Sequence, residues 1–157
     1  MYIHTKSLVD VKDYGHFKTV SNLLKDIGYQ VFQLGLEDDP NLEGVEKLTL
    51  PLKELMTRFS NKECDLFIGL DSGLSFIAAA YGTPCIVILG ATNKTTSGPW
   101  GENVKILQSV QHERCFIDRK GVRCHGIMNG KCGFGEKCIN SINPGEILKL
   151  AQQVLNK

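Results

Sequence analysis

The pattern of apolar positions is most regular between Cys64 and Asn93, where two short apolar runs flank a helical repeat. The run from Cys64 to Gly69 is too short for a buried helix and ends at a glycine, which is typical of a strand. Apolar residues then recur at helical spacing until Gly82-Thr83-Pro84, which ends a helix. A second continuous apolar run extends from Cys85 to Leu89. Two fully apolar strands joined by a helix predict a parallel sheet that is buried on both faces.

The pattern on either side of this unit predicts further strands and helices in alternation. Apolar residues between Phe17 and Ile27 mark an amphipathic helix that Gly28 closes, and Pro51 suits the first turn of a second helix. In chain order, we expect at most the end of a strand at 1–4, a helix from 17, strands at 29–34 and 47–50, a helix over 52–59, an edge strand at 104–107 and a helix at 144–155. This alternation fits an α/β fold, a Rossmann-like doubly wound parallel sheet.

Residues 111–141 interrupt the pattern. This segment shows neither a helical nor a strand period, and it is rich in glycine and in cysteine. We therefore expect one domain in three parts, which are a Rossmann-like core over 1–110, a Cys/Gly-rich loop over 111–141 and a C-terminal helix of the same domain within 142–157.

Composition and charge narrow the classes of function. The chain has 157 residues, enough for one domain with a real core, and its 42% apolar and 22% charged residues are ordinary for a globular protein. The formal net charge of +1 gives no basic field for nonspecific nucleic-acid binding. No apolar run approaches the length of a membrane span, and the chain does not open with a secretory signal pattern, so we expect a cytoplasmic location.

The turn Asp71-Ser72-Gly73 is the sharpest candidate for chemistry. It follows a predicted buried strand and opens a helix, which is where open α/β sheets bind anionic ligands. Free backbone N–H groups at a helix start attract phosphate, glycine lets a ligand approach closely, and the serine hydroxyl can donate. A second interpretation needs no ligand, because aspartate and serine are also common helix caps.

Read with its flanks, this segment resembles the donor-binding half of glycosyltransferase family 9, the heptosyltransferases that use ADP-heptose. Family members carry D-[ST]-G-x-x-H-x-A-A-x-x-x-x-P, then a strand and a G-P-T-like loop. The matching positions here are Asp71, Ser72, Gly73, Ala78, Ala79, Pro84, Gly90 and Thr92. Weaker matches are Lys12–Phe17 with the family's helix entry, Gly28–Val31 with its G-x-x-V strand, Pro99–Gly101 with a turn, and Cys138–Glu146 with its C-x-x-x-I-x-P-E-E-V ending. The resemblance implies the C-terminal half of a GT-B glycosyltransferase.

The resemblance also implies roles for individual residues. Ser72 and Gly73 would hold the donor diphosphate, and Asp71 would order their turn. Lys12, with Thr5 or Ser7, would neutralise the leaving diphosphate. One acid of 37–39, with Asp39 as the candidate, would accept hydrogen bonds from ribose or sugar hydroxyls. The donor-binding set that the resemblance implies includes Thr5 and also contains Phe76 and Thr92. Without the family pattern, the preferred interpretation of Lys12 is a solvated lysine near a helix start, and that of the acids is a charged surface loop.

Two departures from the family pattern affect the functional prediction. Phe76 stands where the family has a histidine, and a phenyl ring cannot donate to a phosphate or sugar oxygen. An aromatic residue there is similar to the autotransporter-type heptosyltransferases, which also carry a cysteine cluster. The second departure is larger, because family members have a first domain that supplies the acceptor site and the catalytic base. We expect that base to lie on an absent domain or a partner chain, so no catalytic residue is assigned.

The cysteines Cys115, Cys124, Cys132 and Cys138 have the spacing C-x8-C-x7-C-x5-C. Four thiolates in an irregular loop can hold one tetrahedral metal ion and so fold the loop. Because the resembling autotransporter enzymes hold iron here, we expect a structural iron or zinc ion, while catalysis itself needs no metal. Free thiols, or disulfides in an oxidising compartment, are the alternatives. Cys64 and Cys85 fit better as small buried residues than as ligands.

These observations lead to one functional interpretation and two rivals. The chain is interpreted as the donor-binding domain of a glycosyltransferase that moves a heptose, or a related sugar, from a nucleotide sugar to an acceptor hydroxyl. It would work with an acceptor glycan or protein bound by a missing N-terminal domain or partner chain. The rivals are a non-catalytic nucleotide-sugar-binding module, and an interaction module built around a metal-bound cysteine loop.

Overall fold

The computed structural model describes residues 1–111, 124, 132 and 137–155 of the chain. The strands are β1 (Tyr2–His4), β2 (Phe32–Leu34), β3 (Glu46–Leu48), β4 (Phe67–Leu70), β5 (Cys85–Leu89) and β6 (Val104–Gln108). The helices are α1 (Phe17–Asp26), α2 (Leu52–Ser60), α3 (Gly73–Ala80), α4 (Lys94–Ser97) and α7 (Pro144–Leu155), with short 3-10 turns η1 (Asp10–Lys12) and η2 (Cys138–Ser141).

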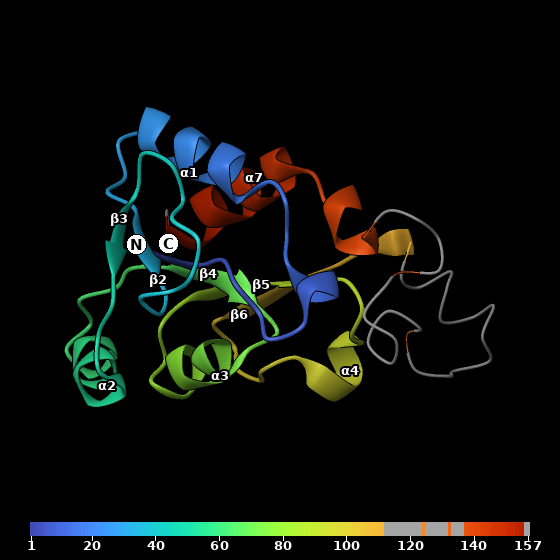
Figure 1. The fold of residues 1–157 in the computed structure, drawn as a ribbon. Coiled ribbons are helices and arrows are strands. Elements are labelled where there is room, and N and C mark those ends of the chain that lie inside the picture. The colour runs from blue at the N-terminus through green and yellow to red at the C-terminus, as the bar shows by residue number, and fades with distance from the viewer. Residues whose placement is uncertain (112–123, 125–131, 133–136, 156–157) are drawn as a thin grey trace.

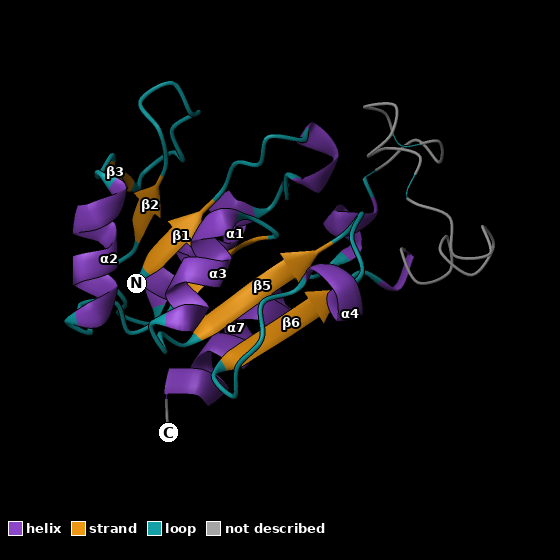
Figure 2. Cartoon of the chain, turned by 90° about the horizontal axis from the view of Figure 1, so that it is seen from below, coloured by secondary structure: helices purple, strands orange, loops and turns teal. Residues whose placement is uncertain are grey.

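The six strands form one sheet in the order β3-β2-β1-β4-β5-β6, and every neighbouring pair is parallel (Figure 2). The chain moves outward from β1 to β3 and then returns to the centre to build β4 to β6 on the other side. The direction of winding therefore reverses between β1 and β4, which is where doubly wound sheets bind ligands. The predicted Rossmann-like fold is confirmed.

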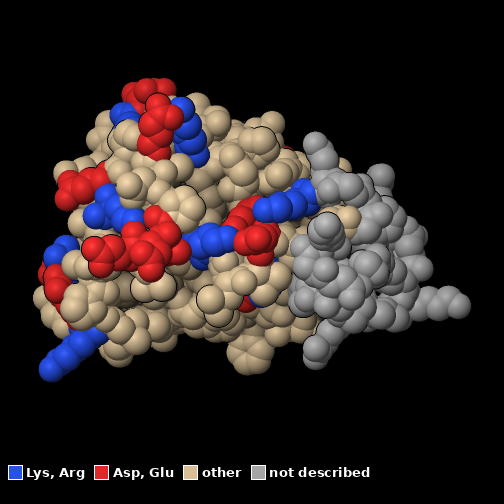
Figure 3. Space-filling view, viewed as in Figure 1, with Lys and Arg blue, Asp and Glu red and all other residues tan. Residues whose placement is uncertain are grey.

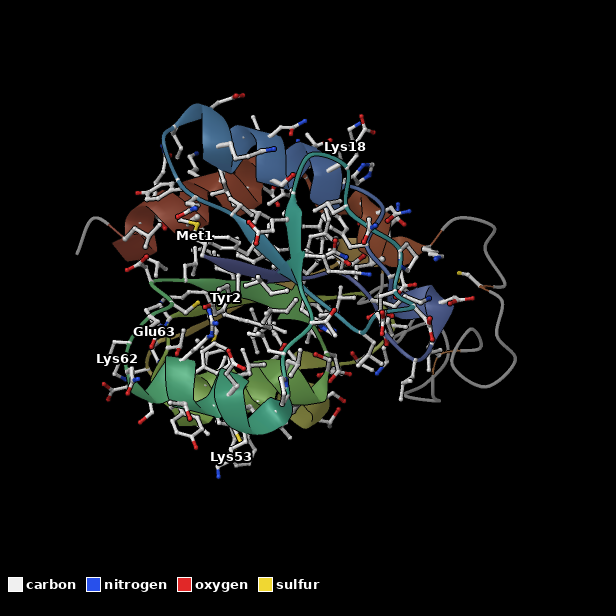
Figure 4. All side chains as sticks on the ribbon, turned by 60° about the vertical axis from the view of Figure 1, so that its left-hand side comes forward. Met1, Tyr2, Lys18, Lys53, Lys62 and Glu63 are labelled. Carbon is white, nitrogen blue, oxygen red and sulfur yellow. The ribbon has the colours of Figure 1, made fainter. Side chains whose placement is uncertain are left out.

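Helices cover both faces of the sheet. Helices α1 and α7 pack together on one face, and α2, α3 and α4 lie across the other (Figure 1). Each face has its own apolar core, and the side chains of adjacent residues Met1 and Tyr2 belong to opposite cores (Figure 4). The central strands β4 and β5 are apolar on both sides because both sides are buried, and every residue of β5 is 0% exposed.

The boundaries of the elements follow from local backbone chemistry. Helix α7 has the predicted bounds, but β2 begins at Phe32 and not at Tyr29, because the N–H groups of Gly28 and Tyr29 still donate to carbonyls of α1. Gly28 has a φ of +91°, the left-handed conformation that ends a helix and favours glycine. A helix-ending glycine thus delays the next strand by several residues.

The largest difference from the sequence-based expectation is the first strand. The sequence predicts only the end of a strand at residues 1–4, yet β1 is a central strand that pairs with β2 on one side and β4 on the other. Ile3 in its middle is fully buried. The sequence did not indicate a central strand because β1 has only three residues, which are too few to show the alternation typical of a strand.

The end of the predicted irregular loop joins the core. Residues 138–141 form η2, and its Ile139 is only 1% exposed among the residues that pack against α1 and α7. Tyr14 donates from its hydroxyl to the carbonyl of Ile142 at 2.6 Å, and Asn140 accepts from the N–H of Gly15 at 2.8 Å. These contacts tie the C-terminal part of the chain to the entrance of α1.

Charged side chains of both signs are mixed on the face shown in Figure 3. Basic side chains lie beside acids there, so the described residues of this face present no single-sign field that would attract nucleic acid. Within the described residues, no helix is both long and apolar enough to cross a membrane.

Burial makes two of the six cysteines poor nucleophiles. Cys64 and Cys85 are 3% and 0% exposed, and burial raises the pKa of their thiols to about 11 and about 12. Only the thiolate reacts, and at pH 8 its fraction would be roughly one in a thousand or less. We expect iodoacetamide at pH 8 to leave both residues unmodified in the native protein and to alkylate them in denaturant, as read by peptide mass spectrometry. Alkylation of native Cys85 at the rate of a free cysteine would contradict the burial.

Candidate functional site

A cleft of about 740 Å³ opens at the carboxyl ends of β1, β2 and β3, beside the start of α3. Its position is the point where the winding of the sheet reverses, between β1 and β4. Its lining divides into a polar side, formed by the end of β1, the loops after β1 and β2 and the turn after β4, and an apolar side, formed by leucines of β2, β3 and α2. The polar side contains His4, Lys6, Ser7, Asp10, Lys12, Asp39, Ser72 and Gly73.

The start of α3 is open toward this cleft. Ser72 occupies the N-cap position with extended backbone, but its side chain makes no capping hydrogen bond. The interpretation of Ser72 as a helix cap is therefore wrong. A Cβ atom added at Gly73 would meet no atom from other parts of the described chain within 4 Å, so a ligand can approach the start of α3 at this residue. Uncapped N–H groups at a helix start favour an anion.

Lys12 lies directly beside this helix start. The turn η1 carries it across from the loop after β1, and its Nζ atom lies 2.8 Å from Oδ2 of Asp71. The two side chains are only 19% and 12% exposed. An ammonium group has three donors, so Lys12 can hold Asp71 and still donate to a ligand. A second ion-pair cluster fixes η1, because Lys6 lies 2.6 Å from both Asp10 and Asp13.

One acid of the loop after β2 faces the cleft. Among residues 37–39, only Asp39 belongs to the lining, while Glu37 and Asp38 are exposed elsewhere. The Oδ2 atom of Asp39 accepts from the N–H of Leu36 at 2.7 Å, and it packs where a side chain at Gly35 would stand. Asp39 thus presents a carboxylate held by its own loop, which can accept hydrogen bonds from ligand hydroxyls.

The opposite side of the cleft is apolar and partly open to water. Leu36 and Leu52 are 71% and 52% exposed, although leucine is usually buried, and Leu48 and Leu50 continue this surface. An apolar wall with polar groups on one side is the usual composition of a small-molecule site. The arrangement can hold a molecule with a flat apolar part and an anionic part.

His4 is a cleft residue that the sequence did not identify. It ends the central strand β1, it is 9% exposed, and its Nδ1 atom lies 3.1 Å from the hydroxyl oxygen of Ser72. Burial lowers its pKa below the ordinary value, while the nearby carboxylates of Asp39 and Asp13 oppose that shift. The available signal was its place at the carboxyl end of a strand, which the shortness of the strand obscured.

Four residues of the predicted donor site lie outside the cleft lining, although one of them, Asp71, contacts the lining residue Lys12. Thr5 accepts from Gln33 at 2.9 Å and borders a neighbouring hollow. Phe76 is 45% exposed on α3, and the hydroxyl of Thr92 is buried with no hydrogen-bond partner among the described residues. The structure therefore brings together Lys12, Asp39, Ser72 and Gly73, with Asp71 joined to them through Lys12, but not Thr5, Phe76 or Thr92.

The predicted metal site cannot be placed. Cys115 lies outside the described residues, and no cluster of three or more metal-ligating side chains occurs among those that the structure describes. The structural iron or zinc ion therefore remains a prediction from the sequence.

Comparison with known proteins gives a family and a fold. The model of glycosyltransferase family 9 (heptosyltransferase) matches residues 2–124. Lipopolysaccharide heptosyltransferase 3 of Escherichia coli K12 is 35% identical over 104 residues, covering 59% of this chain and 30% of that protein. Lipooligosaccharide heptosyltransferase 2 of Campylobacter jejuni is 28% identical over 93 residues, covering 59% of this chain and 26% of that protein. This chain therefore matches about a third or less of each relative.

Solved structures share the fold at low sequence identity. The E. coli heptosyltransferase WaaC with ADP has a TM-score of 0.68 and 15% identity, over 98% of this chain and 43% of that one. The iron-containing dodecameric heptosyltransferase TibC, in complex with ADP-D-β-D-heptose, has a TM-score of 0.73 and 20% identity, over 99% of this chain and 44% of that one. Nearly all of this chain thus corresponds to less than half of a longer fold.

Proposed function

Because the chain belongs to glycosyltransferase family 9, we propose that its cleft binds the nucleotide-sugar donor of a glycosyl transfer, with ADP-heptose as the type of donor. The observation that carries this proposal is the uncapped start of α3 with Lys12 beside it, at the point where the sheet reverses. A diphosphate matches both groups, since it is an anion with several acceptor oxygens. The complexes of WaaC with ADP and of TibC with ADP-heptose support this class of ligand.

Each part of the cleft would contact one part of the donor. The N–H groups at the start of α3 and the Ser72 hydroxyl would donate to the diphosphate, and Lys12 would neutralise it. Asp71 keeps the Lys12 ammonium at the helix start through their 2.8 Å contact. Asp39 would accept hydrogen bonds from ribose or sugar hydroxyls. The exposed leucines would cover the flat face of the base.

In the transfer itself, these residues would act on the leaving group. The acceptor oxygen forms a bond to the anomeric carbon, the bond from that carbon to the diphosphate breaks, and the acceptor proton passes to a base. The negative charge that develops on the departing diphosphate is what Lys12 and the start of α3 would stabilise. We propose that the acceptor site and the base come from a second half, which matches the share of the longer relatives that this chain leaves uncovered.

The rival of a non-catalytic nucleotide-binding module uses the same cleft. It is favoured by Phe76, which stands at the family's histidine position and lies on the exposed side of α3. Both interpretations require nucleotide binding, so binding is the first property to test. Any structural metal ion held by the cysteine segment would take no part in nucleotide binding.

Replacing Lys12 by methionine should weaken ADP binding by roughly 10- to 100-fold, because a hydrogen bond between charged groups contributes about 1.5–3 kcal/mol. Titration calorimetry with ADP measures the effect. Lys18→Met is the matched control, since Lys18 is an exposed lysine of α1 that pairs with Glu43 away from the cleft (Figure 4).

A second variant separates two causes of this loss. Lys12→Met leaves the Asp71 carboxylate without its cation, and that charge alone would repel a diphosphate. The double variant Lys12→Met/Asp71→Asn removes both charges. We expect its ADP affinity to stay low, because the donor to the phosphate is still missing. Recovery of wild-type affinity in the double variant would contradict a direct role for Lys12.

A further inference from the structure

His4 is the most deeply buried ionisable side chain that lines the cleft. It is 9% exposed at the carboxyl end of β1, and one edge of its ring contacts the Ser72 hydroxyl oxygen at 3.1 Å through Nδ1. The other ring nitrogen, Nε2, has no hydrogen-bond partner among the described residues and is not among their buried unpaired atoms. The imidazole therefore connects the floor of the cleft to the residue at the start of α3.

The contact between His4 and Ser72 has two forms with opposite consequences. When Nδ1 carries a proton, it donates to the Ser72 oxygen, and the hydroxyl proton of Ser72 can point to a ligand. When the proton is only on Nε2, Nδ1 must accept the Ser72 proton, and the serine then offers a ligand only its lone pairs. A phosphate oxygen needs donors, so only the first form suits an anion.

We propose that His4 is a positioning residue for the donor diphosphate, in that it donates from Nδ1 to Ser72 and so directs the Ser72 hydroxyl proton to a diphosphate oxygen. This inference rests on the proposed function, because it assigns a task within the same cleft. It adds a residue of β1 to a site that is otherwise built from η1, the turn after β4 and the loop after β2.

The charges around His4 determine how binding and protonation are linked. The carboxylates of Asp39 and Asp13 face it and favour the imidazolium, while burial disfavours it. The remaining charged groups of the cleft, Lys6, Lys12 and Asp10, are already in ion pairs within the described residues, with Asp13 and Asp71 as the other partners. In the empty cleft the pKa of His4 is therefore lowered.

A bound diphosphate changes this balance. Its negative charge beside Ser72 stabilises the imidazolium, so the pKa of His4 rises on binding and the complex takes up a proton. The additional affinity is fully present below the pKa of the empty form and is lost as the pH rises through the pKa of the loaded form. Inside that window, affinity changes by up to about tenfold per pH unit for one proton.

Calorimetry of ADP binding in two buffers of different ionisation enthalpy, from pH 5.5 to 8, measures the protons taken up. We compare the wild type with His4→Asn, which keeps an N–H donor toward Ser72 but cannot titrate. The ionisation of ADP itself contributes equally in both proteins. The difference in proton uptake between the wild type and His4→Asn is therefore due to His4. We expect the wild type to take up as much as one more proton, and its affinity advantage over the variant to fall roughly 3- to 10-fold across the range. His16→Asn, on the exposed residue before α1, should behave as the wild type does.

The possible outcomes separate the two proposals. If the wild type does not bind ADP, both proposals are wrong. If it binds ADP, takes up no more protons than His4→Asn and shows an unprotonated Nδ1 by nitrogen NMR of the complex, the role of His4 is wrong and the proposed function stands. Extra proton uptake, or a neutral imidazole with its proton on Nδ1, supports the role. Should His4→Asn fail to fold, nitrogen NMR of the wild-type imidazole decides the question, because a Nδ1 that stays unprotonated after ADP addition overturns the inference. A Nδ1 that is protonated in the complex supports it.

Discussion

Replacing Gly73 by valine is expected to abolish measurable ADP binding and to leave the fold and the melting temperature nearly unchanged. Among the described residues, none from outside the start of α3 lies within 4 Å of a Cβ added at Gly73, so the fold accepts a side chain there. In the proposed binding mode, the diphosphate occupies the space beside Gly73 to reach the N–H groups at the start of α3. A valine would exclude the ligand from its donors.

The size of the expected effect depends on how many hydrogen bonds the valine prevents. Excluding a diphosphate removes two or more hydrogen bonds to a charged group, each contributing about 1.5–3 kcal/mol, so affinity should fall by roughly 100-fold or more. Calorimetry with ADP and a thermal melt of the same preparation measure both parts of the prediction. Gly73→Ala should give a smaller loss of affinity, because its methyl group occupies less of the space.

Ala80→Val is the matched control for the helix itself. Ala80 is exposed at the far end of α3, so it tests the effect of valine on that helix without approaching the cleft. We expect ADP affinity close to that of the wild type. If Gly73→Val binds ADP as tightly as Ala80→Val does, the diphosphate does not lie at the start of α3.

The second large effect is on stability, at Gly90. This residue follows β5, and a Cβ atom there would stand 2.5 Å from the Cβ of Ile139 and 3.0 Å from its backbone N and Cα atoms. Ile139 is 1% exposed, so it has no free space into which to move. We expect Gly90→Ala to lower the free energy of unfolding by about 1–3 kcal/mol, and Gly90→Val to lower it further.

Thermal unfolding measures this loss, at about 2–4 °C for each kcal/mol in a chain of this size. Gly73→Ala makes the same chemical change where no atom is close, and it should leave the melting temperature nearly unchanged. An unchanged melting temperature for Gly90→Ala would show that Ile139 does not pack against this glycine. The family resemblance places Gly90 in a donor-site loop, whereas its immediate contact is with η2.

The sequence predicted elements where a periodic pattern was long enough to be distinctive. The apolar repeat of α7 and the two apolar runs around α3 predicted the right elements. A helix with one buried face has apolar residues at helical spacing, and a strand buried on both faces is a continuous apolar run. The three-residue strand β1 is too short to show such a pattern. Its central position depends on pairing with β2 and β4, which are distant in sequence.

The site was partly predictable for the same reason. Asp71, Ser72 and Gly73 are adjacent in a recognisable turn, and Lys12 was found through the family pattern. That Lys12 contacts Asp71, 59 positions away, depends on how η1 crosses the sheet edge. Whether Ser72 caps its helix depends on side-chain direction, and His4 depends on the position of β1, so neither followed from the order of residues.

The junction of Tyr14 and Gly15 with residues 140–142 has a consequence for the time course of folding. Helix α1 packs against α7, so the core cluster that contains Phe17, Val20 and Leu24 is complete only after more than a hundred further residues have been synthesised. Contacts so distant in sequence are slow to form, since the intervening chain must close a long loop. The surface of α1 that packs on α7 is therefore exposed while the residues between the two helices are synthesised, and during that time it is open to chaperones and to aggregation.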